Sequence, residues 1–261
     1  MSAVTGFAEL ERWLLLGMFL ILRPGAAIAA APILGGVQVP MQLRVAMSLA
    51  IGLSAARHLP LASVPTPWTL DGVLAIAGEL AIGAAIGLAA QVGFAAALTA
   101  GELLGGAMGL SFAALMDPLT GRPSQALGQR LTAIATLLFF IGDGHLLLLS
   151  SVAHSYDYWP VGASAELFSV AGRIAGLGSA VLGAAVSIAA PVLGAALMLQ
   201  LVMAMLSRSA PQLNLFAVGL PATLMGGLVL LALAFPAVRA ASDAAIGDGL
   251  REAQRVATRA P

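Results

Sequence analysis

Long apolar runs separated by short polar or proline-rich breaks cover most of the chain. The runs lack the strict alternation of apolar and polar residues that a strand of a membrane barrel shows. Backbone groups in lipid must be hydrogen-bonded within their own segment, so we predict helices. Six helices or helical pairs are expected, over residues 10–34, 41–57, 70–104, 126–150, 172–207 and 213–239. The predicted fold class is all-α, a polytopic membrane protein of tightly packed helical hairpins.

Two of these runs are longer than one straight membrane span. Arg173 and Arg208 bracket 34 residues without a charge, and Arg208 and Arg239 bracket 30 more, whereas about 20 residues cross the hydrocarbon core. The first of the two helices must therefore be tilted, broken near Pro191, or continued beyond the membrane.

Composition agrees with a membrane protein and limits its chemistry. Hydrophobic residues make up 60% of the chain and charged residues 9%, against about 25% charged residues in soluble domains. The formal net charge is zero, which argues against a nucleic-acid partner. Cysteine is absent, so disulfides and thiolate metal sites are excluded.

The N-terminal apolar run could be mistaken for a signal peptide. It covers residues 13–22 and is followed by small residues at 26–31. Arg23 and Pro24 stand between the two stretches, and Glu9 and Glu11 accompany the early Arg12. A signal peptide has a basic start and no such interruption, so we expect the first helix of the mature protein.

Glycine pairs spaced by four residues predict faces on which neighbouring helices approach closely. They are Gly83/Gly87, Gly101/Gly105, Gly105/Gly109 and Gly172/Gly176.

Three ordered motifs carry a family resemblance. Residues 100–118, AGELLGGAMGLSFAALMDP, place a carboxylate and a glycine cluster in apolar surroundings. Gly142-Asp143-Gly144-His145-Leu146 follows, and then Ala210-Pro211-Gln212-Leu213-Asn214-Leu215-Phe216. Together they resemble the FliR family of export-gate proteins, over about residues 10 to 240. The resemblance implies a subunit of a larger helical channel assembly in the bacterial inner membrane, at the flagellar basal body, through which unfolded flagellar proteins are exported.

The resemblance also implies partners and a division of the chain. Residues 1–170 correspond to a FliP-like helical portion, residues 171–240 to a FliQ-like helical hairpin, and residues 241–261 form a polar tail, most simply a solvated helix or a loose end. FliP-like and FliQ-like subunits and an FlhB-like protein are the expected partners. Arg208 and Gln212, near the tip of the hairpin, are candidate partner contacts.

The segment 105–117 has the character of a gate. Adjacent glycines permit unusual backbone turns, flexible or bulky apolar side chains follow, and an apolar constriction can block ions by dewetting. A packed kink between two core helices is the plainer interpretation. The FliR resemblance favours a pore constriction, although Ala107 stands where many members carry Gln. The constriction residues are Gly105, Gly106, Met108, Gly109, Leu110, Phe112, Leu115, Met116 and Asp117.

The other ionisable residues that could carry chemistry also have plain structural interpretations. Glu79 and Glu102 are carboxylates in apolar runs, which suggests either proton coupling or hydrogen bonding to a neighbouring helix or a water-filled lumen. The spacing of Asp143, His145, His154 and Asp157 does not favour a metal site. Asp143 lies between Gly142 and Gly144, which more simply predicts a turn. Neither a nucleophilic relay nor a phosphate-binding lysine is recognisable. We therefore expect no enzyme activity, no cofactor and no metal.

Three alternatives stay open. A virulence-type secretion homologue would share the fold and mechanism but export other proteins. A proton-coupled small-solute carrier would use Glu79 or Glu102 and act alone. A scaffold without a channel role would tolerate changes in the gate segment without ion leakage.

Overall fold

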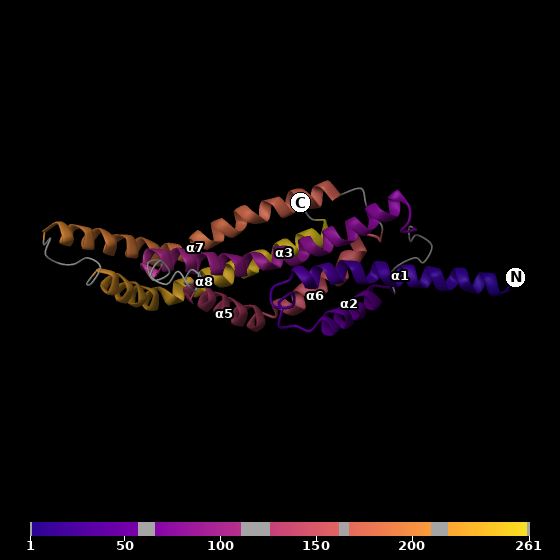
Figure 1. The fold of residues 1–261 in the computed structure, drawn as a ribbon, viewed down its shortest axis with the longest axis horizontal. Coiled ribbons are helices and arrows are strands. Elements are labelled where there is room, and N and C mark those ends of the chain that lie inside the picture. The colour runs from indigo at the N-terminus through magenta and orange to yellow at the C-terminus, as the bar shows by residue number, and fades with distance from the viewer. Residues whose placement is uncertain (1, 57–65, 111–125, 162–166, 210–218, 260–261) are drawn as a thin grey trace, which may run out of the picture. The chain divides into compact units, whose positions relative to one another are not determined.

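The computed structural model describes residues 2–56, 66–110, 126–161, 167–209 and 219–259, without the side chains of 2–12, 167–168 and 207. The prediction of an all-α polytopic membrane protein is confirmed (Figure 1). The helices are α1 (Ser2–Ala30), α2 (Met41–Ala56), α3 (Leu70–Ala107), α5 (Ala126–Ile141), α6 (Gly144–Tyr158), α7 (Leu167–Ser209) and α8 (Leu220–Thr258).

Four of the described helices are long and apolar enough to cross a membrane, namely α1, α3, α7 and α8. The pair α5 and α6, bent by 66°, would form a fifth, broken span. Pro191 and Pro236 lie inside α7 and α8 and do not end them. The alternative of a helix broken near Pro191 is therefore wrong, and α7 continues for 43 residues.

The chain forms two compact units. Unit 1 contains residues 1–92, 140–178 and 247–261, and unit 2 contains residues 93–139 and 179–246. The boundaries fall inside α3, α5, α7 and α8. This division follows contacts within the chain, whereas the expected FliP-like and FliQ-like portions rest on resemblance and stay a prediction.

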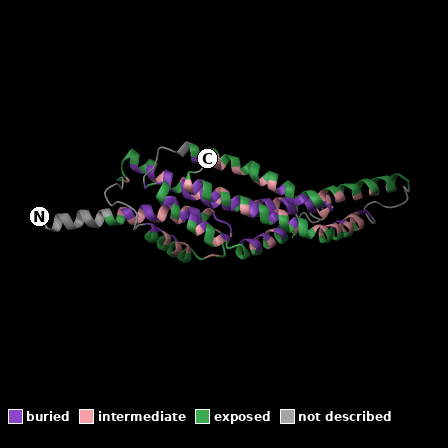
Figure 2. Cartoon of the chain, turned by 180° about the vertical axis from the view of Figure 1, so that it is seen from behind, coloured by how far each residue is buried: buried purple, intermediate pink, exposed green. Residues whose placement is uncertain are grey.

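The core of unit 1 lies where α1 packs against α2, α3 and α6. Phe19 is fully buried, and Leu16 and Leu20 lie on the same face of α1. Figure 2 shows buried and exposed residues sharing each helix. The cluster comprises Leu16, Phe19, Leu20, Ala55, Ala75, Tyr156 and Val161.

One face of α3 is built for close approach to α1. A Cβ on Gly83 would lie 2.2 Å from the Arg23 carbonyl oxygen, and one on Gly87 would lie 2.4 Å from the Ala27 carbonyl oxygen. Glu79 lies four residues before Gly83, which lies four residues before Gly87, so the three positions share one face of α3. The prediction from the Gly83/Gly87 pair is confirmed.

Gly172 and Gly176 make no close helix contact within the described part of the chain. No atom there lies within 4 Å of a Cβ placed on either residue, so the prediction for this pair is not met by another helix of the same chain. In unit 2, by contrast, a Cβ on Gly101 of α3 would lie 2.4 Å from the Cα of Gly128 in α5. Phe94 and Phe139 of the same two helices pack edge to face, with ring centroids 5.3 Å apart.

The expected turn at Gly142-Asp143-Gly144 separates α5 from α6. Asp143 adopts the left-handed conformation, with φ 53° and ψ 26°, which Asp tolerates better than most residues. Its carbonyl oxygen accepts hydrogen bonds from the N–H groups of Leu146 and Leu147. The bend between the two helices therefore has a local cause in the sequence.

The polar tail is only partly solvated. Helix α8 continues to Thr258, and Leu250, Ala253, Val256 and Ala257 are buried. The charged side chains occupy other positions, where Arg255 donates to Glu252 at 3.3 Å. Of the two expectations for the tail, the loose end is therefore wrong, and the tail is a helix with one buried and one exposed face.

We expect Gly83→Ala to destabilise the protein by roughly 1–3 kcal/mol, because α1 must move away from α3. Gly172→Ala is the matched control, since it gains the same helix propensity without a clash. Denaturant unfolding of both variants in mild detergent measures the difference. Equal stability of the two variants would contradict the close approach of α1 and α3.

Candidate functional site

The first part of the predicted constriction lies at the C-terminal end of α3. Helix α3 ends at Ala107, and Gly105 and Met108 are buried whereas Gly106 is exposed. Gly109 and Leu110 are partly buried. Phe112, Leu115, Met116 and Asp117 lie outside the described residues, so their predicted role stays a prediction.

Glycine allows this helix end to form. The N–H of Met108 donates to the Leu104 carbonyl oxygen at 2.9 Å, and that of Gly109 donates to the Gly106 carbonyl oxygen at 3.1 Å. Gly109 then takes φ +81°, a conformation that is typical of glycine just after a helix. The backbone therefore changes direction inside the predicted constriction.

The end of α3 packs against α7 and α8 within unit 2. The side-chain amide of Gln200 in α7 donates to the Ala107 carbonyl oxygen, and Met108 lies against Gly227 in α8. An amide group thus reaches residue 107 from another helix, although residue 107 itself is Ala. Sequence reasoning missed Gln200 and Gly227, because nothing in their local pattern links them to residues about 100 positions away.

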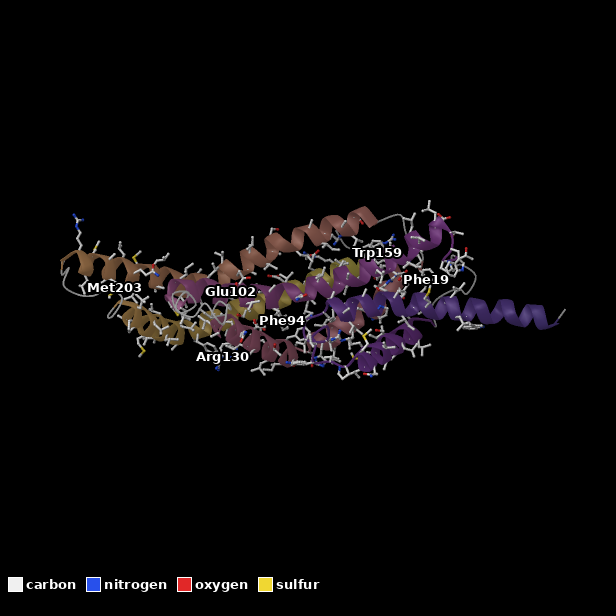
Figure 3. The ribbon with its side chains drawn as sticks, in the orientation of Figure 1. Phe19, Phe94, Glu102, Arg130, Trp159 and Met203 are labelled. Carbon is white, nitrogen blue, oxygen red and sulfur yellow. The ribbon has the colours of Figure 1, made fainter. Side chains whose placement is uncertain are left out.

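The two predicted intramembrane carboxylates have different surroundings. Glu102 is exposed on α3 in this single chain (Figure 3), and its Cγ would lie 3.6 Å from a Cβ on Gly128. Glu79 is 1% exposed. A polypeptide can hold such a buried carboxylate in its charged form only with a partner.

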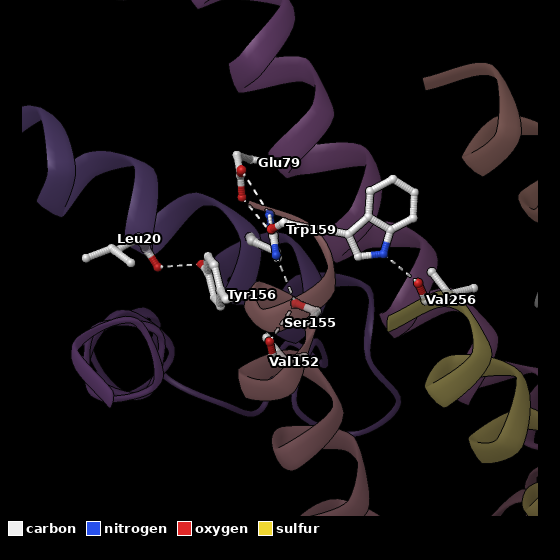
Figure 4. Close-up of polar contacts among 8 residues, drawn as sticks. Leu20, Glu79, Val152, Ser155, Tyr156, Trp159 and Val256 are labelled. Atoms are coloured by element: carbon white, nitrogen blue, oxygen red, sulfur yellow. Dashed lines mark hydrogen bonds and ion pairs between the residues drawn. The ribbon is translucent and has the colours of Figure 1, made fainter. Parts of the chain in front are cut away.

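Arg23 of α1 is that partner. Its Nε donates to Glu79 Oε2 at 2.8 Å and its Nη2 donates to Glu79 Oε1 at 3.0 Å, which is the bidentate geometry that a guanidinium forms best. Arg23 is 0% exposed. The two residues are 56 positions apart in the sequence, and their contact is drawn in Figure 4. Of the two interpretations of Glu79, the structure therefore displays hydrogen bonding to a neighbouring helix.

The remaining donors of Arg23 reach the C-terminal end of α6. Nη1 donates to Ser155 Oγ at 3.1 Å, and Nη2 also donates to the Trp159 carbonyl oxygen at 2.9 Å. The guanidinium carbon lies 4.1 Å from the centre of the Tyr156 ring. A cation at this position also interacts favourably with the negative end of the helix. Arg23 therefore joins α1, α3 and α6.

Tyr156 supplies a hydrogen bond that the backbone of α1 lacks. Pro24 lies inside α1 and has no N–H, so the carbonyl oxygen of Leu20, four residues earlier, loses its helical donor. The Tyr156 hydroxyl donates to that oxygen at 3.1 Å (Figure 4). The phenol thus satisfies the one carbonyl that the proline frees.

Trp159 makes a similar contact at the end of α8. Its Nε1 donates to the Val256 carbonyl oxygen at 3.0 Å, and this carbonyl lies in the last turn of α8, where helical donors are missing. The guanidinium carbon of Arg259 lies 4.2 Å from the centre of the Trp159 ring. These contacts hold the end of α8 against the C-terminal end of α6.

The other candidate polar residues do not converge on one centre. Asp143 and His145 lie at the N-terminal end of α6, and His154 Nδ1 lies 3.2 Å from Asp157 Oδ2 near the opposite end, where both side chains are largely exposed. No cluster of three or more His, Cys, Asp or Glu suited to a metal occurs among the described residues. Arg208 is exposed in the last turn of α7, and Gln212 lies outside the described residues.

Comparison with known proteins identifies the family. Residues 14–248 match the family described as bacterial export proteins, family 1. The chain belongs to this family. The chain is 33% identical to the flagellar biosynthetic protein FliR of Escherichia coli K12, over 87% of this chain and 86% of that protein. It is 32% identical to FliR of Pectobacterium carotovorum, over 82% of this chain and 81% of that protein.

A second kind of relative covers less of the chain. The Yop proteins translocation protein T of Yersinia pestis is 32% identical over 47% of this chain and 48% of that protein. The membership in the FliR family is therefore shown over most of the length. The family match includes the described helix end at residues 105–110 and the pair formed by Arg23 and Glu79.

Removing one member of the buried pair should be strongly destabilising. We expect Arg23→Met or Glu79→Gln to lower the free energy of unfolding by about 3–5 kcal/mol, because an uncompensated buried polar group is left. The double variant Arg23→Met/Glu79→Leu should recover part of that loss. Arg173→Gln is the control, because its partly exposed pair with Glu252 contributes about 1 kcal/mol or less. Single variants no worse than this control would contradict the assignment.

A double-mutant cycle tests the repair of the Leu20 carbonyl. Tyr156→Phe should cost about 1–3 kcal/mol, because that carbonyl loses its donor. In a Pro24→Ala background residue 24 has an N–H that can bond within the helix, so the same Tyr156→Phe change should cost distinctly less. Detergent unfolding of the four proteins measures this coupling. An equal cost in both backgrounds would show that Pro24 and Tyr156 are unconnected.

Proposed function

We propose that this protein is a subunit of the flagellar type III protein export gate, which forms, with FliP-like and FliQ-like subunits, the channel through which unfolded flagellar proteins cross the inner membrane. The observation that carries the proposal is the similarity to FliR proteins over more than 80% of both chains.

The end of α3 supports a role in closing a channel. Irregular backbone at membrane depth is tolerated only inside protein or along a cavity. Here a helix ends at Ala107, a buried Met108 follows, and Gly109 turns the backbone. The proposed constriction is the segment 105–117, of which residues 105–110 are described.

A flagellar rather than a virulence assignment is favoured by coverage. Two FliR proteins align over 82% and 87% of this chain, a third FliR protein aligns over 52%, and the Yop translocation relative aligns over 47%. The longer of these alignments are thus with flagellar proteins. The flagellar basal body of the inner membrane is therefore the proposed location.

Exposed apolar side chains on α7 and α8 support a helical assembly. They form long stretches that a single chain leaves uncovered, and lipid or the proposed FliP-like, FliQ-like and FlhB-like partners would cover them. The exposed residues are Leu197, Met198, Leu201, Val202 and Met205 on α7, and Met225, Leu228, Val229, Leu233 and Phe235 on α8. Arg208 at the exposed end of α7 fits the proposed partner contact.

The carrier alternative has weaker support. A proton-coupled carrier needs a carboxylate that changes its protonation state during transport, whereas both oxygens of Glu79 accept from Arg23. This bidentate contact engages both carboxylate oxygens in a structural pair. Glu102 is the other candidate residue, and it is exposed in the single chain beside the proposed gate.

Deletion of the gene from its source cells, followed by complementation with tagged protein, tests the function. We expect loss of flagellar protein export on deletion, restoration by the wild type, and co-purification of FliP-like and FliQ-like proteins. Met108→Ala should restore export yet raise ion leakage, because an apolar seal is removed. Met205→Ala is the matched control, since Met205 is 61% exposed on α7.

Each alternative has its own outcome. Loss of a virulence-type secretion activity, with flagella intact, would replace the flagellar assignment with its homologue. Solute transport by the purified chain alone in liposomes would favour the carrier. Export that depends on the chain while Met108→Ala leaves leakage unchanged would favour the scaffold.

A further inference from the structure

Three consecutive residues at the end of α3 each contact a different residue of α7 or α8. The Ala107 carbonyl oxygen accepts from the Gln200 amide, Met108 lies against Gly227, and a Cβ on Gly109 would lie 3.0 Å from the Leu220 side chain. All of these residues belong to unit 2. The helix end is therefore held from two helices that are distant in sequence.

Gly227 leaves no room for a side chain beside Met108. A Cβ on Gly227 would lie 2.5 Å from Met108 Cγ, 3.0 Å from its Sδ and 3.1 Å from its Cε. The nearest of these atoms is close to the backbone of Met108 rather than at the flexible end, so rotation of the terminal methyl cannot relieve the clash. Any residue larger than glycine at this position must displace Met108, which is 1% exposed.

Gln200 adds a hydrogen bond that fixes the same helix end. Carbonyl groups in the last turn of a helix lack donors from their own helix, and the Gln200 Nε2 supplies one to Ala107. The Gln200 amide binds the backbone carbonyl of Ala107, and Gly227 packs against the side chain of Met108. The two contacts together fix both the direction of the chain and the position of Met108.

We propose that Gly227 and Gln200 are positioning residues of the export gate, which hold Met108 in the closed constriction. This inference rests on the proposed function, because it assigns Met108 to the seal. Gly227 provides the notch into which Met108 fits, and Gln200 holds the helix end from which Met108 projects. Loss of either contact should favour leakage without removing a residue of the constriction itself.

The experiment compares Gly227→Ala with Gly226→Ala in the assembled complex of the source cells. Both changes add one methyl group in the same helix, but a Cβ on Gly226 meets the terminal Leu199 Cδ2 atom, which can rotate away. We expect Gly227→Ala to raise ion leakage about 5- to 150-fold, the range that about 1–3 kcal/mol of overpacking corresponds to. Gly226→Ala should leak as the wild type does.

A double variant tests whether Gly227 acts through Met108. Met108→Ala alone should leak, and Gly227→Ala/Met108→Ala should leak no more than Met108→Ala alone, because the displaced side chain is gone. A merely structural defect at residue 227 would instead add to the leak. Such additivity would overturn the proposal.

Gln200→Leu provides a test that adds no bulk. It removes the donor to Ala107, so we expect leakage to rise, with FliP-like and FliQ-like proteins still co-purifying. Should Gly227→Ala fail to accumulate, this variant decides, and unchanged leakage would overturn the proposal.

The outcomes separate the two proposals. A leaking Met108→Ala complex together with a tight Gly227→Ala complex would contradict the positioning role and leave the export-gate function in place. A Met108→Ala complex that does not leak, or a chain that purifies without export partners, would contradict the proposed function itself.

Discussion

The buried ion pair between Arg23 and Glu79 is the constraint on which the packing of unit 1 depends. Two charges that are 0% and 1% exposed are stable only when each is paired and hydrogen-bonded. The bidentate contact therefore fixes the separation and rotation of α1 against α3. Gly83 and Gly87, on the same face of α3 as Glu79, let the two backbones come close enough for that contact.

The same demand for hydrogen bonding explains the other polar contacts of unit 1. Pro24 frees a carbonyl in α1, and the ends of α6 and α8 leave carbonyls without helical donors. Tyr156, Arg23 and Trp159 donate to the carbonyls of Leu20, Trp159 and Val256 respectively. Because these contacts are buried, the three side chains supply donors that water cannot supply there.

The sequence predicted those features of the fold that neighbouring residues along the chain determine. The apolar runs indicated the helices, and Gly142-Asp143-Gly144 indicated the bend before α6. The spacing of Gly83 and Gly87 indicated a tight helix contact. The partner of Glu79 could not be predicted from helical spacing, because Arg23 lies 56 residues away. An arginine inside the first apolar run was the available signal, since a charge there needs a partner of opposite sign.

Properties that depend on distant neighbours could not be predicted in this way. The notch at Gly227 and the amide of Gln200 become visible only when α3, α7 and α8 are placed together within unit 2. The Gly172/Gly176 pair has the same spacing as Gly83/Gly87 yet faces open space among the described residues. Spacing thus identifies a face that permits close packing, and the rest of the fold decides whether a helix lies there.

The most direct test of the Arg23–Glu79 pair is a high-resolution cryo-electron microscopy map of the protein in its assembly, purified from source membranes. We expect continuous side-chain density between Arg23 and Glu79, with the guanidinium also against the Trp159 carbonyl. Density that directs Arg23 to lipid headgroups or to a partner subunit, with Glu79 contacting another group, would contradict it.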